Sequence, residues 1–247
     1  MKIAGSRVLI TGANRGLGLA LVTAMRAAGA AKIYAAARKA KAVAAVDIVR
    51  PISLDITDDA QVAEAAVRCG DVSILVNNAG IASFTPALGS PSIDNARREM
   101  ETNYFGTLAM CRAFAPVLKE NGGGTIVNML SVVSWMNVPM QATYCASKAA
   151  AWSLTKAVRF ELRAQGTLVI GVYAGYIDTG MTAGVDAPKS SPESIAAEIV
   201  AGIENGTEDI LADERARSVN AELRKDDRAF DANMQRMWDE AQGVKRS

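Results

Sequence analysis

A tyrosine and a lysine stand four positions apart in the segment YCASK, at Tyr144 and Lys148. At helical spacing the two side chains share one face of a helix and can approach each other. A cation near a phenol favours the phenolate and lowers the pKa of the tyrosine, so this pair could act as an acid and base near neutral pH. The same spacing also occurs in helices without any catalytic role, so other parts of the chain have to decide between the two interpretations.

Composition restricts the available chemistry. The 247-residue chain contains no histidine, which excludes Ser-His-Asp and Cys-His catalysis. Its cysteines, Cys69, Cys111 and Cys145, are scattered and match no disulfide framework or zinc motif, so we expect no metal. A net charge of +1 gives no general attraction to nucleic acid or acidic membranes. No apolar run is long enough to span a bilayer and no signal peptide is recognisable, so we expect a cytoplasmic protein.

The segment TGANRGLG joins an apolar, strand-like run to a stretch with helical spacing. Gly12, Gly16 and Gly18 in this turn would let backbone N–H groups approach a pyrophosphate at the N-terminus of the helix. The spacing Gly-x-x-x-Gly-x-Gly differs from the commoner dinucleotide fingerprint Gly-x-Gly-x-x-Gly. A glycine-rich turn without a ligand is the alternative.

The second strand-like run ends in YAAARKAK, and this end indicates which dinucleotide is bound. Ala37 stands where an acidic residue would bind the ribose 2′-hydroxyl of NAD. Arg38, Lys39 and Lys41 follow it, and Arg15 lies in the glycine turn. Positive groups suit the additional phosphate of NADP, so we expect NADP(H) as the cofactor. The alternative is a solvated basic loop.

Apolar segments alternate with helical segments along most of the chain. The expected strands are RVLITG (7–12), KIYAAAR (32–38), VRPISLDIT (49–57), VSILVNNAG (72–80), GTIVNMLS (124–131), GTLVIGVYAG (166–175) and EDILAD (208–213). This pattern predicts an α/β protein, a single-domain Rossmann fold over residues 1–247 whose doubly wound, mostly parallel sheet carries helices on both faces. We expect the charge-mixed stretch from about 214 to 247 to be a helical extension on the surface or in contact with a partner, separate from the site.

Several motifs in a fixed order resemble the short-chain dehydrogenase/reductase family over about residues 7–181. They are the Thr-Gly-x-x-x-Gly-x-Gly turn, NNAG at 77–80, Asn103, Ser131 and Tyr144-x-x-x-Lys148. Ser131 precedes Tyr144 by thirteen residues, which is the usual interval in the family. The resemblance implies a Rossmann fold and an NADPH-dependent oxidoreductase that reduces a ketone or aldehyde to an alcohol by hydride transfer.

The resemblance also implies a role for each site residue. Tyr144 would be the general acid and base, with Lys148 and the positive nicotinamide lowering its pKa. Ser131 would hold the substrate oxygen, and Asn103 would anchor a water that returns the proton through Lys148. The expected cofactor contacts are Gly12, Asn14, Arg15, Gly16, Leu17, Gly18, Arg38, Asp55, Ile56, Asn77, Ala79, Gly80, Tyr144, Lys148, Gly175, Ile177 and Thr179. Asp55 would lie near the adenine, and Thr179 at the nicotinamide carboxamide.

Apolar and aromatic side chains follow the catalytic segments, and no basic cluster accompanies them. The expected substrate pocket consists of Phe84, Val133, Trp135, Met140, Tyr176 and Met181, with Met136 nearby. This lining suits an uncharged, hydrophobic or aromatic ketone or aldehyde, although such residues also fill cores. The short segment 179–191 predicts a small lid, and Ala174 stands where the family commonly has proline.

Two other functions are compatible with the sequence. A 3-oxoacyl-(acyl-carrier-protein) reductase would need a basic patch for an acidic carrier, for which Arg97, Arg98, Arg159 or Arg163 are candidates. A non-catalytic NADP(H)-sensing protein would bind cofactor without turnover, although the tyrosine and the lysine are both present.

We expect a small-molecule carbonyl or alcohol substrate and no nucleic-acid or membrane partner. By resemblance, the chain forms a homodimer through the helices that carry Asn103 and Tyr144, or a homotetramer. The atypical C-terminal stretch puts the tetramer in doubt.

Overall fold

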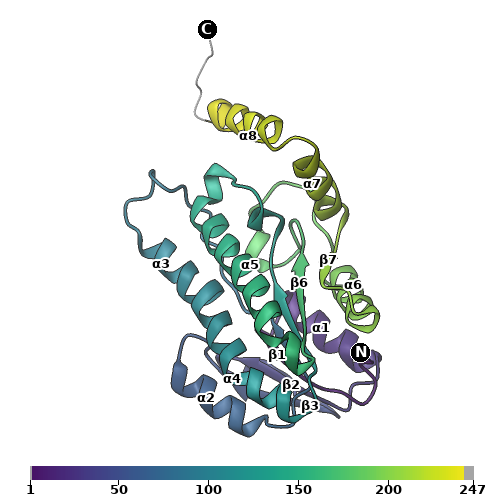
Figure 1. Ribbon diagram of the computed structural model, residues 1–247. Coiled ribbons are helices and arrows are strands. Elements are labelled where there is room, and N and C mark those ends of the chain that lie inside the picture. Colours follow the sequence, from purple (N-terminus) through teal and green to yellow (C-terminus); the bar gives the residue numbers. More distant parts are fainter. Residues whose placement is uncertain (1, 242–247) are drawn as a thin grey trace.

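A computed structural model describes residues 2–241, and seven parallel strands form its single sheet (Figure 1). The strand order is β3-β2-β1-β4-β5-β6-β7. The strands are β1 (Arg7–Thr11), β2 (Lys32–Ala37), β3 (Val49–Ser53), β4 (Ile74–Asn77), β5 (Thr125–Met129), β6 (Leu168–Tyr173) and β7 (Asp209–Leu211). The order reverses between β1 and β4, which places a binding crevice at the carboxyl ends of these strands. The predicted Rossmann-type fold is confirmed.

Helices cover both faces of the sheet (Figure 1). They are α1 (Gly16–Ala27), α2 (Asp59–Arg68), α3 (Asp94–Met100), α4 (Thr107–Glu120), α5 (Ala142–Leu162), α6 (Pro192–Asn205), α7 (Glu214–Lys225) and α8 (Asp227–Ala241). Helices α1 and α6 pack together on one face, and α2, α4 and α5 form the layer on the other. A π-helical turn at Glu101–Gly106 links α3 to α4.

The strands are apolar along their length because both faces of the sheet are buried. In β1, Val8 and Ile10 belong to the core on the α1 side, whereas Leu9 belongs to the core on the α4 side. Successive residues of a strand point to opposite faces, so an uninterrupted apolar run fills both cores. Asp58 caps α2 by accepting hydrogen bonds from the N–H groups of Ala60 and Gln61.

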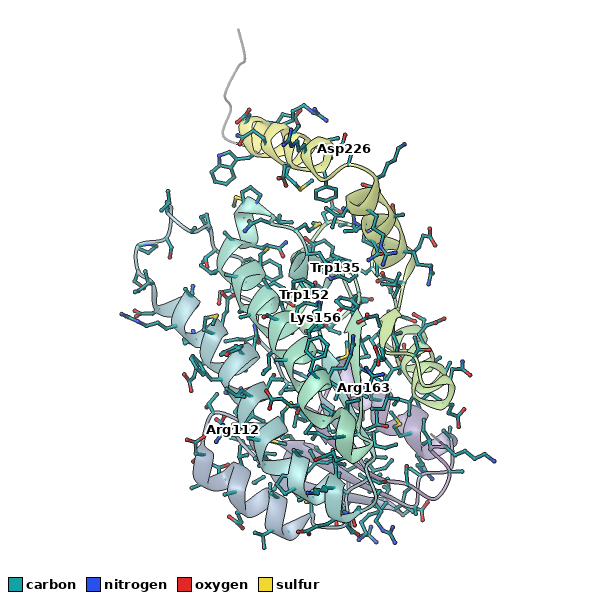
Figure 2. All side chains as sticks on the ribbon, in the orientation of Figure 1. Arg112, Trp135, Trp152, Lys156, Arg163 and Asp226 are labelled. Carbon is teal, nitrogen blue, oxygen red and sulfur yellow. The ribbon has the colours of Figure 1, made fainter. Side chains whose placement is uncertain are left out.

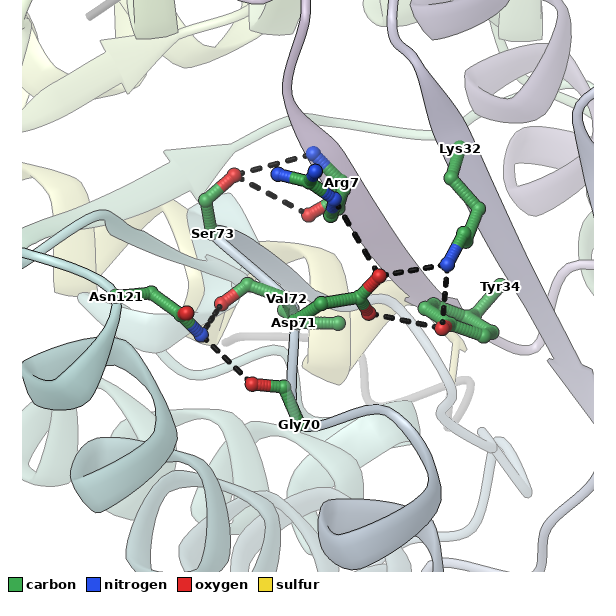
Figure 3. Close-up of polar contacts among 8 residues, drawn as sticks. All are labelled: Arg7, Lys32, Tyr34, Gly70, Asp71, Val72, Ser73 and Asn121. Atoms are coloured by element: carbon green, nitrogen blue, oxygen red, sulfur yellow. Dashed lines mark hydrogen bonds and ion pairs between the residues drawn. The ribbon is translucent and has the colours of Figure 1, made fainter.

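Charged side chains form a polar network at the N-terminal ends of β1 and β2 (Figure 3). Asp71 accepts hydrogen bonds from Lys32 Nζ at 2.6 Å and from the Tyr34 hydroxyl at 2.8 Å. The Nε atom of Arg7 lies 3.4 Å from the same carboxylate. This network is at the opposite end of the strands from the crevice.

The C-terminal helices pack against short turns of the chain. Helix α7 contacts the 3-10 turn Val132–Ser134, and α8 contacts the 3-10 turn Pro139–Gln141. Phe230 and Met234 of α8 are buried in the same apolar cluster as Val132 and Val133. Helices α7 and α8 thus pack against turns that flank the predicted catalytic segment, and the separation of the extension from the site stays a prediction. Residues 242–247, the end of the predicted extension, lie outside the described chain.

Two further observations apply to residues 2–241. None of the helices there is long and apolar enough to cross a bilayer. The same part of the chain contains no group of three or more cysteine and carboxylate side chains placed to hold a metal ion.

Candidate active site

The glycine turn lies at the carboxyl end of β1, where the crevice opens. Gly12 and Gly16 have φ values of +66° and +52°, a region that favours glycine. A Cβ atom on Gly18 would lie 2.1 Å from the carbonyl oxygen of Gly12, so no larger residue fits there. The three glycines are thus required by the local backbone, whichever ligand the turn binds.

The start of α1 fits the pyrophosphate of a dinucleotide. Arg15 precedes the helix in an extended conformation, and its side chain makes no capping hydrogen bond. The first turn of α1 contains no acidic residue. The backbone N–H groups of this turn and the positive end of the helix dipole can therefore serve a bound anion. Asn14 lies in the same turn, and the predicted contact residue Leu17 is buried in the core beneath it.

The segment NNAG is joined to the glycine turn by hydrogen bonds. The Thr11 hydroxyl accepts bonds from the backbone N–H groups of Asn78 and Ala79, both at 3.0 Å. Asn78 Nδ2 donates to the carbonyl oxygens of Thr11 at 2.8 Å and Gly12 at 3.3 Å. Thr11 and Asn78 were not among the predicted site residues, but they fix Ala79 beside the glycine turn.

Asn77 is placed differently from its neighbour. Its side chain is buried and Nδ2 donates to Asn128 Oδ1 at 2.8 Å. Asn128 in turn donates to the Thr155 hydroxyl at 3.0 Å. The Asn77 side chain thus links β4 to β5 and α5 within the core, so a contact with the cofactor would have to come from its backbone.

Thr179 closes the crevice opposite the glycine turn. A Cβ atom on Gly16 would lie 3.0 Å from Thr179 Cγ2, which shows how closely the two segments approach. Ile177 pairs with Ser190 in an isolated β-bridge and so closes the base of the short segment between them. The backbone N–H of Gly175 donates to Asp213 Oδ2 at 2.9 Å.

The end of β2 carries the basic residues that the sequence assigned to NADP. Arg38 follows Ala37 directly and is exposed, as is Arg15 in the glycine turn. Asp55 accepts hydrogen bonds from the backbone N–H and the hydroxyl of Thr57, at 3.1 and 2.8 Å. Ile56 is buried against Gly106.

Tyr144 and Lys148 share one face near the start of α5. The Lys148 Nζ atom lies 5.8 Å from the centroid of the Tyr144 ring and donates to the carbonyl oxygen of Met129 at 2.8 Å. Lys148 is buried, and desolvation lowers its pKa to about 8. Gly80 is adjacent, because a Cβ atom there would lie 3.7 Å from Lys148 Nζ.

The pKa of Tyr144 reflects its surroundings in the folded chain. Burial raises the pKa of the phenol well above its usual value, and Cys145 and Glu99 act in the same direction. The neighbouring Ser131 hydroxyl opposes this rise in the pKa. Without a cofactor, desolvation dominates the pKa of Tyr144. That Lys148 and the positive nicotinamide together lower this pKa stays a prediction.

Ser131 lies just beyond the end of β5. Its hydroxyl donates to the carbonyl oxygen of Ala174 at 3.3 Å and accepts from the N–H of Val133 at 3.4 Å. These bonds fix the side chain at the start of the 3-10 turn Val132–Ser134. The structure thus places the buried Ser131 and Lys148 and the partly buried Tyr144 near one another at the carboxyl ends of the central strands.

Asn103 holds the segment that follows NNAG. Its Nδ2 donates to the carbonyl oxygen of Ile81 and to the Ser147 hydroxyl, both at 2.9 Å, and its Oδ1 accepts from the N–H of Ile81 at 2.9 Å. Asn103 lies in the π-helical turn, and such turns occur often at functional sites. The side chain uses both of its N–H hydrogens within the protein, and its role as a water anchor stays a prediction.

The predicted pocket residues divide into two groups. Phe84, Met140, Tyr176 and Met181 are partly or well exposed around the crevice side of the molecule. Phe84 has a φ of +48°, which is unusual for an aromatic residue and marks local strain. The Tyr176 hydroxyl accepts a hydrogen bond from Gln141 Nε2, which joins the segment after β6 to the start of α5.

Val133 and Trp135 point into the protein. Val133 is buried, and Trp135 stacks on the Tyr173 ring with centroids 4.1 Å apart. Trp135 also lines a cavity with Trp152 and Lys156 of α5 and with Asn220 and Arg224 of α7 (Figure 2). None of the predicted catalytic residues lines this cavity. Trp135 therefore has a packing role, and its place in a substrate pocket stays a prediction.

Sequence reasoning missed two buried acids, Glu99 and Asp213. Glu99 stands four residues before Asn103. This helical spacing places the two side chains on one face of a helix, and it was the available signal for Glu99. Asp213 caps α7 and accepts hydrogen bonds from Gly175 and Ser190, joining the segment after β6 to the C-terminal helices. No local pattern could have indicated these long-range bonds.

The fold and the crevice define a dinucleotide-binding α/β oxidoreductase. The family model for short chain dehydrogenases matches residues 6–190. The chain belongs to the short-chain dehydrogenase/reductase family. It acts on alcohol or carbonyl substrates with a nicotinamide cofactor.

Three relatives illustrate the family. A short chain dehydrogenase from Burkholderia cenocepacia J2315, solved in complex with NADP, is 40% identical with a TM-score of 0.92, covering 95% of this chain and 99% of that one. The ketoacyl reductase HetN of Nostoc sp. is 30% identical over 86% of this chain and 80% of its own. The sorbitol dehydrogenase of Cereibacter sphaeroides is 34% identical over 79% of each chain.

Proposed function

We propose that this protein is an NADPH-dependent carbonyl reductase that converts a ketone or aldehyde to an alcohol. The observation that carries the proposal is the cluster of buried Ser131 and Lys148 with the partly buried Tyr144 beside the glycine turn. A phenol and an ammonium group within one apolar site can supply the proton that carbonyl reduction requires.

Each residue of the cluster has a defined task in this proposal. The bound cofactor supplies the hydride that adds to the carbonyl carbon. Ser131 donates a hydrogen bond to the carbonyl oxygen and orients it, and Tyr144 transfers its phenolic proton to that oxygen as charge develops there. Lys148 stabilises the resulting phenolate, and its own proton is available near neutral pH because burial lowers its pKa to about 8.

Arg38 and Arg15 support NADPH as the cofactor. Both are exposed at the edge of the crevice, and Ala37 offers no carboxylate to a ribose 2′-hydroxyl. We expect Arg38→Asp to weaken NADPH binding at least tenfold, about 1.4 kcal/mol, while NADH binding changes little. Fluorescence titration with both dinucleotides measures this difference.

A matched control is Lys2→Asp, which makes the same change of charge at an exposed position before β1, at the other end of the sheet. Equal loss of NADPH and NADH affinity in Arg38→Asp would contradict the role of Arg38. Loss of NADPH affinity in Lys2→Asp would point to a general electrostatic effect.

An uncharged hydrophobic or aromatic carbonyl compound is the substrate class that we infer from the partly exposed Phe84 and Tyr176 and the exposed Met140 and Met181. The test measures NADPH and NADH consumption with aryl ketones, aldehydes and a 3-oxoacyl thioester, and dinucleotide reduction with polyols. We expect turnover of aryl carbonyls with NADPH. Turnover of polyols alone would contradict this substrate class. Tight NADPH binding without turnover of any compound would favour the NADP(H)-sensing alternative.

A 3-oxoacyl thioester reductase is the second candidate, because the relative from Nostoc sp. is a ketoacyl reductase. Arg97 and Arg98 on α3 are exposed and could contact an acidic carrier protein. Arg159 is less suitable, because it already binds the carbonyl oxygen of Val169 and the carboxylates of Glu208 and Asp209.

We also infer a homodimer through the α4 and α5 layer. Phe105, which precedes α4, and Phe160 of α5 are exposed aromatic residues, with 49% and 71% of their surfaces accessible. Exposed apolar side chains of this size are common at interfaces between subunits. A cytoplasmic location and a single domain stay predictions from the sequence.

A further inference from the structure

Glu99 is fully buried, and one of its carboxylate oxygens is without a partner. It lies near the end of α3 with no accessible surface. Its Oε1 accepts a hydrogen bond from the backbone N–H of Ser83 at 2.6 Å, whereas Oε2 is buried and has no hydrogen-bond partner within residues 2–241. An unpaired polar atom of this kind is costly and calls for an explanation.

Hydrogen bonds fix Glu99 next to the helix that carries Tyr144. Helix α3 packs along α5 (Figure 1). Alternate residues of the segment that follows NNAG form hydrogen bonds with side chains. These side chains come from α3, from α5 and from the π-helical turn between α3 and α4. The pairs are Ile81 with Asn103, Ser83 with Glu99 and Thr85 with Thr143. Thr143 directly precedes Tyr144, so the segment that binds Glu99 is also bound to the start of α5.

The charge of Glu99 acts on this part of α5. Burial is the largest cause that raises the pKa of Cys145, and Glu99 acts in the same direction. Burial is also the largest cause that raises the pKa of Tyr144, and Cys145 and Glu99 add to it. The other groups that face the phenol are Tyr176, from the segment after β6, the Ser131 hydroxyl, and Lys148 on the same helix.

Glu99, on α3, and Lys148, on α5, are buried ionisable side chains that act on the same phenol. Within residues 2–241 neither of them forms an ion pair. Lys148 favours the phenolate of Tyr144, and an anion at Glu99 favours the neutral phenol. The two buried charges therefore have opposite effects on the same proton.

We propose that Glu99 is a positioning residue that acts through Tyr144, opposing Lys148 so that the phenol keeps its proton until the substrate oxygen takes it. Glu99 touches neither substrate nor cofactor in this role. The proposal rests on the proposed function, because it assigns Tyr144 as the proton donor.

The variant that tests the proposal is Glu99→Gln. Glutamine has the same size and still accepts the hydrogen bond from Ser83, but it carries no charge. In the NADP⁺ complex, we expect the titration midpoint of Tyr144 to fall by about one pH unit, a tenfold change in the acid dissociation constant. Ultraviolet tyrosinate absorbance measures it, with the corresponding Tyr144→Phe protein subtracted to remove the other four tyrosines. The alkaline limb of the pH profile of kcat/KM for reduction should move in the same direction.

The matched control is Glu101→Gln, which removes a carboxylate from an exposed position two residues away. Glu99→Met serves as a second variant, because an apolar side chain of similar volume often replaces a buried charge without loss of stability. An unmoved tyrosinate midpoint in the folded variants would overturn the proposal, even if activity falls. The absorbance titration needs no substrate, so it tests Glu99 even if the proposed carbonyl reductase activity is absent.

Discussion

The two ends of the parallel sheet differ in the surroundings of their ionisable side chains. At the N-terminal ends of the strands, Asp71 binds Lys32, Tyr34 and Arg7 in one partly exposed network (Figure 3). At the carboxyl ends, Glu99 and Lys148 are buried, and neither has an ion partner among the described residues.

The pKa shifts follow this difference. The hydrogen bond to Asp71 is the main cause that raises the pKa of Lys32, so the network favours its charged form. Burial acts to raise the pKa of Asp71, but hydrogen bonds from Lys32 and Tyr34 lower it below its ordinary value. Desolvation instead lowers the pKa of Lys148, which favours the neutral amine. Charges at the first end stabilise the fold, whereas those at the second cost stability and so are candidates for function.

The largest expected effect comes from Lys148→Met. Turnover should fall at least about 100-fold, because the phenolate of Tyr144 loses its cation. The free energy of unfolding should nevertheless rise by about 2 kcal/mol at pH 7, since the variant no longer buries an ammonium group. Urea unfolding together with an activity assay measures both changes.

The increase in the free energy of unfolding of Lys148→Met should depend on pH in a defined direction. The pKa of Lys148 is about 8 in the folded chain and 10.5 is its ordinary value. Between these values the unfolded wild type binds more protons than the folded one, so wild-type stability rises with pH. The difference in the free energy of unfolding between Lys148→Met and the wild type should therefore be largest below pH 8 and should vanish towards pH 10.5. Lys156→Met, at an exposed position on the same helix, is the control, and equal stabilisation there would contradict the account.

A smaller and opposite effect is expected from Asp71→Asn. Removing the carboxylate should lower the free energy of unfolding by about 1 kcal/mol, because the network is partly exposed to solvent. Turnover should stay unchanged, since the network lies at the far end of the sheet. Asp71 has a lowered pKa when folded, so its contribution is present above pH 3.8 and is lost as the pH falls through the folded value. Denaturant unfolding at pH 7 and pH 3 checks the loss, and a large drop in turnover would contradict the comparison.

The same contrast explains what the sequence could reveal. The strands, the glycine turn and the spacing of Tyr144 and Lys148 are local patterns, and the sequence predicted their structures correctly. The partners of Glu99 and Asp213 are brought together by the fold across long stretches of chain, and no periodicity reports them. The raised pKa of Tyr144 escaped prediction for a related reason, because burial in the folded chain, and not the neighbouring lysine, dominates it.

The most direct test of the account compares binding and turnover in Tyr144→Phe. The phenylalanine keeps the ring but has no proton to donate. We predict that turnover with NADPH falls at least about 100-fold, while the dissociation constant for NADPH is unchanged within error. Substantial residual turnover would contradict the assignment of Tyr144 as the proton donor and, with it, the proposed roles of Lys148 and Glu99.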